Sequence, residues 1–481
     1  MTDEEQSTVK RHSSGISGLD QILGGGLFVG GVYLLAGRPG AGKTLLSNQI
    51  AFDHTARGGR VLYITLLAES HARMLALMEP MSFFRGEHVG TSLQYISGYQ
   101  ALEKGKLAGL VQVIRAAVRS HRATLLVVDG LLTAHDLADT DIELKKFVHE
   151  LQTLAELAGC TTLLLRGAHD VEASYPERTM ADGLVLLSTR HIGMRSVREI
   201  DVQKHRGSAH VMGSNFFEIS NKGLTIYPRT ETRFGVAMAN ERDDDGRVAT
   251  GVASLEAVFR GGLPERSSTM LLGSPGSGKT LLGLQFLEAG ARAGDPALYF
   301  GFNEAPARIA RKAKAIGLEL KSYMSSGLLD IQWHAPQEPL ADKLADALFD
   351  NIKQRQVRRV FIDGVEGFEA GLVYPERRLP FSISIDNELR LQGVTALMSG
   401  QVPAVLGGDF TMPLGASEIV DNIVLLRHIE NGTHLQRLAS VMKMRDQPYE
   451  TSVREFEITA GGIRLRAQRR SKSPRRRKAR G

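Results

Sequence analysis

The sequence contains a single cysteine, Cys160, so no disulfide bond can form within the chain. It has no stretch long and apolar enough to cross a bilayer. Its first 14 residues, MTDEEQSTVKRHSS, are polar and lack the apolar centre of a secretory signal. These absences argue against a disulfide-stapled secreted protein and against a membrane protein. We expect a chain that works in the reducing cytoplasm.

Acidic residues are missing from the last 18 residues, Arg464–Gly481, which contain ten lysines or arginines. This segment contributes +10 to the net charge of +6, which leaves −4 for the rest of the 481-residue chain. The basic character therefore lies in a low-complexity tail that we expect to be disordered. Such a tail either binds acidic partners or nucleic acid or has no fixed partner, whereas the mildly acidic body argues against a DNA-binding channel.

The chain does contain a long internal repeat. The segment SGISGLD, which begins at Ser14, aligns with TGVASLE, which begins at Thr250, at an offset of 236 residues. The same offset aligns the glycine-rich runs Gly37–Thr44 and Gly273–Thr280. A repeat of this length indicates a duplicated domain of roughly 220 residues, because solenoid repeats are much shorter.

The repeat sets the predicted domain boundaries. We predict a first domain over residues 10–228, a polar linker over 229–246, a second domain over 247–463 and the basic tail over 464–481. Within each domain, continuous apolar runs of strand length such as RVLYIT and TLLVVDG indicate strands buried on both faces. The predicted fold is α/β, with two tandem domains that each place helices on both faces of a mostly parallel sheet. Charged alternating segments late in each repeat predict added antiparallel strands.

Each repeat has the pattern G-x-x-x-x-G-K-[ST] directly after an apolar run. The glycines let backbone N–H groups turn inward around phosphate oxygens, and the helix that follows presents its positive end to them. We therefore predict two loops that bind ATP, with the lysines reaching the β- and γ-phosphates. The predicted contacts are Gly37, Gly40, Ala41, Gly42, Lys43, Thr44 and Leu45 in the first repeat, and Gly273, Gly276, Ser277, Gly278, Lys279, Thr280 and Leu281 in the second.

The sequence also predicts a Mg²⁺ site beside each loop. The hydroxyl groups of Thr44 and Thr280 are suited to contact Mg²⁺ directly. Asp129 and Asp363 each end an apolar run and precede a glycine, as expected for the carboxylate that holds the metal through water. Each aspartate could instead only cap a turn at the end of a strand. Its place beside a phosphate-binding loop favours the metal site.

The order of these motifs resembles the RecA-type ATPases and, within them, the tandem-domain KaiC family. The most specific matches are the openings SGISGLD and TGVASLE, the two phosphate-binding loops, and the closing segment from Lys443 to Thr459. The resemblance covers nearly the whole body of the chain. It implies a hexameric double ring with ATP at the subunit interfaces, ATPase activity in the first ring, and Ser/Thr autophosphorylation in the second.

The KaiC family has two adjacent glutamates after the strand that follows the loop helix, and one of them polarises the attacking water or hydroxyl. The second repeat has Asn303 and Glu304 there, and the first has only Glu69, next to one inserted residue. The resemblance implies that Glu69 and Glu304 are catalytic, since one carboxylate within reach can orient water. Alternatively, each only begins the next helix in solvent. The missing acids affect the expected rate more than the expected activity, and mainly in the first domain.

Two basic pairs late in the repeats, Lys204 with Arg206 and Lys443 with Arg445, match the family's K-x-R motif. Residues two apart on a strand point to the same side. The resemblance implies that these side chains reach the γ-phosphate held by the neighbouring subunit, as arginine fingers do. The alternative is a charged edge strand that resists aggregation.

The family's adjacent Ser-Thr phosphorylation pair corresponds here to Ser417 and Glu418. Ser417 is the candidate phosphoacceptor. Glu418 cannot accept phosphate, and its fixed negative charge partly imitates a phosphorylated residue. The sequence therefore favours a single-site switch or a permanently biased state over a two-step phosphorylation cycle. The alternative is that Ser417 is an unmodified turn residue.

Three functions remain open at this point. The first is a clock-type signalling ATPase and autokinase that forms homo-oligomers, with signalling proteins as partners. The second is a DNA-handling motor of the recombinase or helicase class, which the basic tail favours slightly. The acidic body and the lack of a basic aromatic segment oppose it, so we expect nucleic acid to bind only through the tail. The third is a nucleotide-gated scaffold with little turnover, which the missing glutamates favour.

Overall fold

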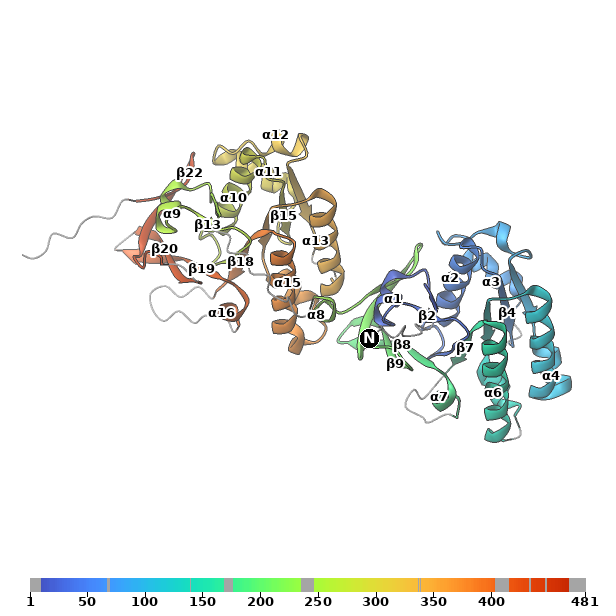
Figure 1. The fold of residues 1–481 in the computed structure, drawn as a ribbon. Helices are drawn as coiled ribbons and strands as arrows, with labels where there is room; N and C mark the ends of the chain where they lie inside the picture. The colour runs from blue at the N-terminus through green and yellow to red at the C-terminus, as the bar shows by residue number, and fades with distance from the viewer. Residues whose placement is uncertain are drawn as a thin grey trace, which may run out of the picture. The chain divides into compact units, whose positions relative to one another are not determined.

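The computed structural model describes residues 10–66, 70–138, 140–167, 176–234, 246–335, 337, 339–402, 415–431, 434–445 and 448–466. The chain forms two compact units that divide between Arg229 and Thr230 (Figure 1). No helix in these ranges is both long and apolar enough to span a lipid bilayer.

The first unit contains, in chain order, β1 (Arg11–His12), α1 (Ser17–Ile22), β2 (Leu27–Phe28), β3 (Val32–Gly37), α2 (Lys43–Ala56), β4 (Val61–Thr65), α3 (His71–Met78), the 3-10 helix η1 (Gly86–His88), β5 (Leu93–Ser97), α4 (Tyr99–His121), β6 (Leu125–Asp129), α5 (Leu131–Asp136), α6 (Asp141–Ala158), β7 (Thr161–Gly167), α7 (Pro176–Met180), β8 (Gly183–Ile192), β9 (Arg195–His205), β10 (Ser214–Ser220) and β11 (Gly223–Tyr227).

The second unit contains α8 (Thr230–Arg233), β12 (Arg247–Val248), α9 (Ala253–Val258), β13 (Leu263–Pro264), β14 (Ser268–Gly273), α10 (Lys279–Ala293), β15 (Ala297–Gly301), α11 (Pro306–Ala315), α12 (Leu320–Ser325), β16 (Leu329–Trp333), α13 (Ala341–Arg355), β17 (Arg359–Asp363), α14 (Glu366–Gly371), η2 (Pro375–Arg377), α15 (Arg378–Leu391), β18 (Thr395–Gln401), α16 (Ala416–Ile419), β19 (Asn422–Asn431), β20 (His434–Met444), β21 (Arg454–Thr459) and β22 (Gly462–Leu465).

Each unit is built around one mixed sheet. In the described part of the first unit its strand order is β11-β10-β9-β8-β3-β7-β6-β4-β5, and in the second it is β16-β15-β17-β18-β14-β19-β20-β21-β22. The strands around β3 and β14 are parallel, and the last four strands of each unit pair antiparallel. The α/β fold and the internal duplication are therefore confirmed.

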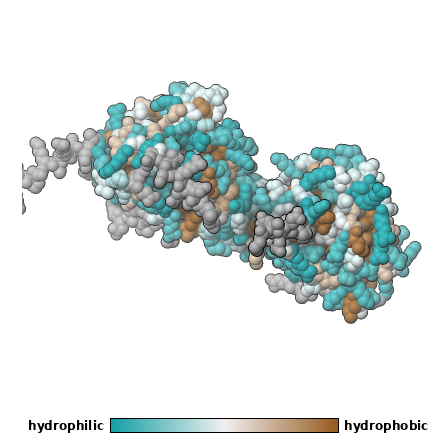
Figure 2. Space-filling view, viewed as in Figure 1, coloured by the Kyte–Doolittle hydropathy of each residue, from teal (hydrophilic) through white to brown (hydrophobic). Residues whose placement is uncertain are grey.

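Helices cover both faces of each sheet, as continuous apolar strands require. In the first unit Leu35 packs in the core beneath α2, whereas its neighbour Leu34 packs in the core beneath α4 and α6. The second unit repeats this arrangement, with α10 on one face and α13 and α15 on the other (Figure 1). The faces of both units shown in Figure 2 are mostly hydrophilic, with apolar residues in small separate patches, so the large apolar clusters lie inside.

The structure differs from the predicted boundaries at two places. Residues 230–233, predicted to begin the linker, form helix α8, in which Thr230 donates two 2.9 Å hydrogen bonds to Asp342 of the second unit. Residues 235–245 of the predicted linker lie outside the described residues. Strand β22 continues to Leu465, two residues past the predicted end of the domain, because it completes the pairing with β21. Residues 467–481 of the predicted disordered tail also lie outside the described residues.

Candidate nucleotide sites

The first phosphate-binding loop connects the end of β3 to the start of α2. Gly40 and Gly42 have φ angles of +78° and +102°, a backbone conformation that favours glycine, so the turn explains both residues. The Nζ of Lys43 donates to the carbonyl oxygens of Gly37 at 2.8 Å and Arg38 at 3.0 Å, which holds the ammonium inside the turn. Burial lowers the pKa of Lys43, and the Asp129 carboxylate opposes this shift.

The second loop repeats this geometry between β14 and α10. Gly276 and Gly278 have φ angles of +77° and +100°. The Nζ of Lys279 donates to the carbonyl oxygens of Gly273 at 2.7 Å and Ser274 at 3.0 Å. The remaining predicted loop residues anchor the two turns: Ala41 and Ser277 are buried, and Leu45 and Leu281 pack against the apolar cores. Both loops thus place a lysine and a helix N-terminus where they can bind a polyphosphate.

The predicted metal-binding residues meet beside each loop. The hydroxyl of Thr44 donates to Oδ2 of Asp129 at 2.9 Å, and the hydroxyl of Thr280 donates to Oδ2 of Asp363 at 3.0 Å. A hydroxyl beside a carboxylate fits Mg²⁺, which binds oxygen ligands and usually retains several waters. The described residues contain no group of three or more His, Cys, Asp or Glu side chains that could hold a metal ion. A Mg²⁺ ion here would therefore need phosphate and water as further ligands.

A tyrosine also contacts each aspartate. Tyr63 on β4 donates to Oδ2 of Asp129 at 3.1 Å, and Tyr299 on β15 donates to Oδ2 of Asp363 at 2.8 Å. Burial raises the pKa of both phenols, so both remain protonated donors. In the sequence, Tyr63 and Tyr299 stand at matching positions of the repeat, 236 residues apart. Their matching could have revealed the contact, because each lies on the strand next to its aspartate.

The two sites differ in the side chains that surround the aspartate. Ser399, the register partner of Asp363, donates to its Oδ1 at 2.8 Å, whereas the register partner of Asp129 is Leu165. Glu366 and Gln401 line a cavity of about 470 Å³ together with the second phosphate-binding loop. Three residues after Asp129 the first unit has Leu132 in place of Glu366, and Gly167 occupies the register position of Gln401. At these three positions the second site is the more polar one.

Of the two predicted catalytic glutamates, the structure describes Glu304. Glu304 lines the cavity of the second site, as does Asn303. The carboxylate of Glu304 forms an ion pair with Lys312, and its Oε2 lies 3.8 Å from Nε of Arg308. Glu69 lies outside the described residues. The assignment of both glutamates as catalytic stays a prediction.

Both K-x-R pairs contact the segment that precedes the neighbouring strand. Lys204 and Arg206 donate to the carbonyl oxygen of Thr179 at 2.9 and 3.0 Å. In the second unit Lys443 donates to the carbonyl oxygens of Ser417 at 2.5 Å and Val420 at 2.7 Å. The guanidinium of Arg445 lies 3.3 Å from Oδ1 of Asp421. Lys443 and the candidate phosphoacceptor thus lie side by side.

These pairs lie at the opposite end of the strands from the loop of their own unit. His205, between Lys204 and Arg206, is opposite Gly183 at the start of β8, whereas the loop begins beside Leu187. Four residues of strand correspond to roughly 13 Å. Part of β9 pairs with β8 on one side and β10 on the other, and part of β20 pairs with β19 and β21 in the same way. In the described pairings the K-x-R end of each strand has a partner on one side, β8 for β9 and β19 for β20. The aggregation-resisting edge therefore remains an alternative for these ends.

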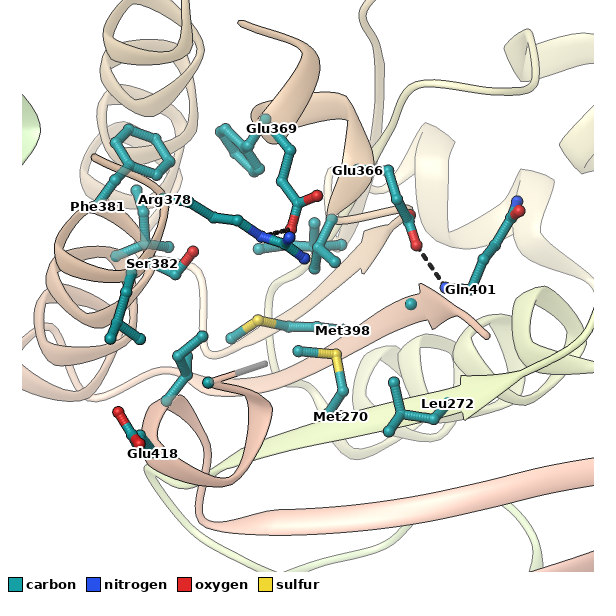
Figure 3. A pocket seen from close by; sticks show the side chains of 18 of the residues that line it. Met270, Leu272, Glu366, Glu369, Arg378, Phe381, Ser382, Met398, Gln401 and Glu418 are labelled. Carbon is teal, nitrogen blue, oxygen red and sulfur yellow. Dashed lines mark hydrogen bonds and ion pairs between the residues drawn. The ribbon is translucent and has the colours of Figure 1, made fainter. Parts of the chain in front are cut away.

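A second cavity of about 560 Å³ lies on the sheet face covered by α14, α15 and α16 (Figure 3). Its floor is formed by apolar strand residues, including Met270, Leu272 and Met398, which Figure 3 shows below two polar contacts. One contact is the 2.7 Å ion pair of Arg378 with Glu369, and the other joins the Glu366 carboxylate to the backbone N–H of Gln401. Glu366 therefore lies between this cavity and the nucleotide cavity.

Two glycine loops with inward lysines, each beside a threonine–aspartate pair on a RecA-like sheet, define a phosphate-loop ATPase class of protein. The family model described as ATPase: KaiC matches residues 12–231 and again 248–470. The chain belongs to the KaiC family of ATPases, as the sequence predicted, and this family implies that the chain binds ATP.

Two relatives show how far this similarity extends. The chain is 26% identical over 465 residues to the circadian clock oscillator protein KaiC of Picosynechococcus sp., which covers 94% of this chain and 88% of the relative. It is 26% identical over 481 residues to the circadian clock protein KaiC3 of Synechocystis sp. This alignment covers 97% of this chain and 93% of the relative. The similarity therefore spans both units.

Proposed function

We propose that this protein is a Mg²⁺-dependent ATPase that forms homo-oligomers, hexamers by family resemblance, and phosphorylates itself on Ser417. It would act as a KaiC-like signalling or timing protein in the cytoplasm. The observation that carries the proposal is the contact of Lys443 with Ser417 at the end of the sheet opposite the phosphate-binding loop. Strand β19 begins at Asn422 beside Thr269, four residues before Gly273, so a phosphate in the loop of the same unit is roughly 13 Å away.

Transfer to Ser417 therefore requires a γ-phosphate other than the one in the second unit's own loop, and we infer that another copy of the chain holds it. The Ser417 oxygen would bond to the γ-phosphorus while the bond to the ADP oxygen breaks. Lys443 and Arg445 would place positive charge beside the transferred group, and bound Mg²⁺ would neutralise charge on the phosphates. Glu418, next to Ser417, carries a permanent negative charge. We infer a single phosphorylation site, with any timing role set by one phosphorylated state.

Measured phosphate release tests the ATPase. Wild-type protein with Mg-ATP should release phosphate well above the Lys43→Ala/Lys279→Ala double variant, and each single variant should retain the turnover of the other site. If the wild type is no faster than the double variant, the protein is a nucleotide-gated scaffold. A further control adds single-stranded DNA, because a motor of the recombinase or helicase class would be accelerated by it.

Radiolabelled ATP tests the autokinase. Label should appear on wild-type protein, disappear in Ser417→Ala, and persist in Ser322→Ala, which removes another exposed helical hydroxyl. Mixing Lys279→Ala copies, which keep the acceptor, with Ser417→Ala copies, which keep the second loop, separates transfer within a chain from transfer between chains. The proposal requires label in this mixture. Label on wild type but none in the mixture, with mixed oligomers present by native mass, would refute transfer between copies.

A further inference from the structure

We propose that Glu366 is a catalytic residue of the second nucleotide site and orients the water that attacks the γ-phosphorus of ATP. This inference rests on the ATPase function proposed above and assigns its acid–base residue. Glu366 is the first residue of α14, three residues after the metal-binding candidate Asp363. It is partly buried and lines the same cavity as Lys279 and Thr280.

The charge of Glu366 acts at the phosphate-binding lysine. Burial lowers the pKa of Lys279, and the carboxylates of Glu366 and Asp363 both oppose this shift. A backbone N–H fixes the direction of the Glu366 side chain, because its Oε1 accepts from the N–H of Gln401 at the end of β18 (Figure 3). A carboxylate that is held by a backbone donor beside the loop is placed to act on a group bound to the γ-phosphate.

The other two carboxylates of this cavity have different surroundings. Asp363 accepts hydrogen bonds from three hydroxyl groups, those of Thr280, Tyr299 and Ser399. Glu304 is held by Lys312, and Arg308 lies nearby. Glu366 instead accepts from a backbone N–H at Oε1, and its Oε2 faces Gly364 beside the metal-binding candidate Asp363.

Asn303 and Glu366 converge above Gly364, although Asn303 follows β15 and Glu366 begins α14. A Cβ placed on Gly364 would lie 2.9 Å from Nδ2 of Asn303 and 3.6 Å from Oε2 of Glu366. The amide donor and the carboxylate acceptor thus face the same small space beside the metal-binding aspartate. The second unit carries an amide at position 303 and supplies the carboxylate from α14. The first unit has Leu132 at the position of Glu366, so the inference concerns the second site alone.

The reaction is a hydrolysis. The water oxygen bonds to the γ-phosphorus as the bond from that phosphorus to the ADP oxygen breaks. A proton of the water passes to the carboxylate of Glu366, which then gives it to the released phosphate or to solvent. Lys279 and the Mg²⁺ pair, Thr280 and Asp363, hold the triphosphate during this step.

The test is made in full-length Lys43→Ala protein, where the second site alone turns over. Glu366→Gln should lower phosphate release about a hundredfold while ATP binding stays within about twofold, because general-base assistance contributes roughly 10²–10⁴-fold. Glu369→Gln is the matched control, since this carboxylate pairs with Arg378 in the neighbouring cavity, and it should leave the rate unchanged. Glu304→Gln should lower the rate less than Glu366→Gln.

A rescue separates catalysis from structural support. Asn303→Glu added to Glu366→Gln should restore at least a tenth of the lost activity, because both side chains reach the space above Gly364. Normal turnover in Glu366→Gln, or a larger loss in Glu304→Gln, would overturn the inference. If Lys43→Ala protein itself releases no more phosphate than the double loop variant, the proposed function of the second site has failed instead.

Discussion

Tyr299 donates a hydrogen bond to the same carboxylate oxygen of Asp363 that accepts the hydroxyl of Thr280, and the first unit repeats this arrangement with Tyr63, Asp129 and Thr44. Each phenol therefore competes with any water that links the aspartate to Mg²⁺. Its hydrogen bond also ties the strand next to the aspartate to the start of the loop helix. The tyrosine thus affects both metal affinity and stability.

Replacing Tyr299 with Phe should make Mg²⁺ bind more tightly at the second site. Asp363 loses one competing donor, so the Mg²⁺ concentration that half-saturates ATP binding should fall a few-fold, while the second unit loses about 1 kcal/mol of stability. Calorimetric titration of ATP at varied Mg²⁺ measures the first effect. Tyr449→Phe is the control, because its hydroxyl donates to the Met442 carbonyl rather than to a carboxylate. A higher Mg²⁺ requirement in Tyr299→Phe would contradict the prediction.

Replacing Gly364 with Ala should slow the second site and destabilise its unit. Gly364 has a φ of +97°, which costs an alanine about 1 kcal/mol, and the added Cβ would displace the Asn303 amide. Gly294→Ala is matched in backbone terms, with a φ of +89° and open space around its Cβ. Both variants should lose similar stability, and only Gly364→Ala should lose phosphate release. Equal turnover in the two would show that the amide position is unimportant.

The buried arginine that ties α8 to the second unit should be essential for stability. Arg377 pairs with Asp342 and Glu231, and its side chain is 8% exposed. Arg377→Ala should cost about 3 kcal/mol, because it leaves buried carboxylates without their cation. Arg378→Ala, whose side chain is half exposed in its pair with Glu369, should cost at most about 1 kcal/mol. Trp333, the chain's one tryptophan, reports unfolding of the second unit by fluorescence. Equal losses would contradict the prediction.

The first unit should lose stability in mild acid. Burial lowers the pKa of His54 and of His205 from 6.5 to about 4. The unfolded chain therefore binds more protons than the folded unit between these values, so stability is complete above pH 6.5 and falls as the pH drops towards 4. Circular dichroism in denaturant at pH 7.5 and 5 should show this loss in the unfolding of the first unit. Trp333 lies in the second unit, so its fluorescence does not report this transition. His205→Asn should reduce the pH dependence, and an unchanged dependence in that variant would exclude His205 as a cause.

The sequence predicted the fold and the loops because both depend on local patterns that the chain repeats. Apolar runs, glycine turns and the lysines Lys43 and Lys279 need no knowledge of distant contacts. Asp129 and Asp363 could be placed beside the loops for the same reason, since each ends its own strand, and their role in binding metal stays a prediction. The role of Ser399 could not be predicted, because it depends on the parallel register of β17 with β18. Glu366 gave no local signal either, since an acidic residue at a helix start is common.

Boundaries were the other limit of prediction. The polar residues of α8 have the composition of a linker, and only the distant partners Asp342 and Arg377 explain why Thr230 and Glu231 are fixed. Likewise, Arg464 begins a basic run by composition, yet it lies on β22 as the register partner of Glu457 on β21. Charge and polarity describe a segment by itself, whereas its structure here depends on long-range contacts.

The polar groups that distinguish the second site lie at the ends of strands and in the short helix that follows β17. The first unit has the same strands and a short helix after β6. The counterparts of Glu366, Ser399 and Gln401 are Leu132, Leu165 and Gly167. An added Cβ on Gly167 would meet only an ordinary contact at 4.0 Å, so this position has room for a larger residue. After the gene doubled, one copy could thus acquire new chemistry through three side chains while its helices and buried layers stayed as they were. Placing those three residues at the matching positions of the first unit would test whether the difference between the sites depends on them alone.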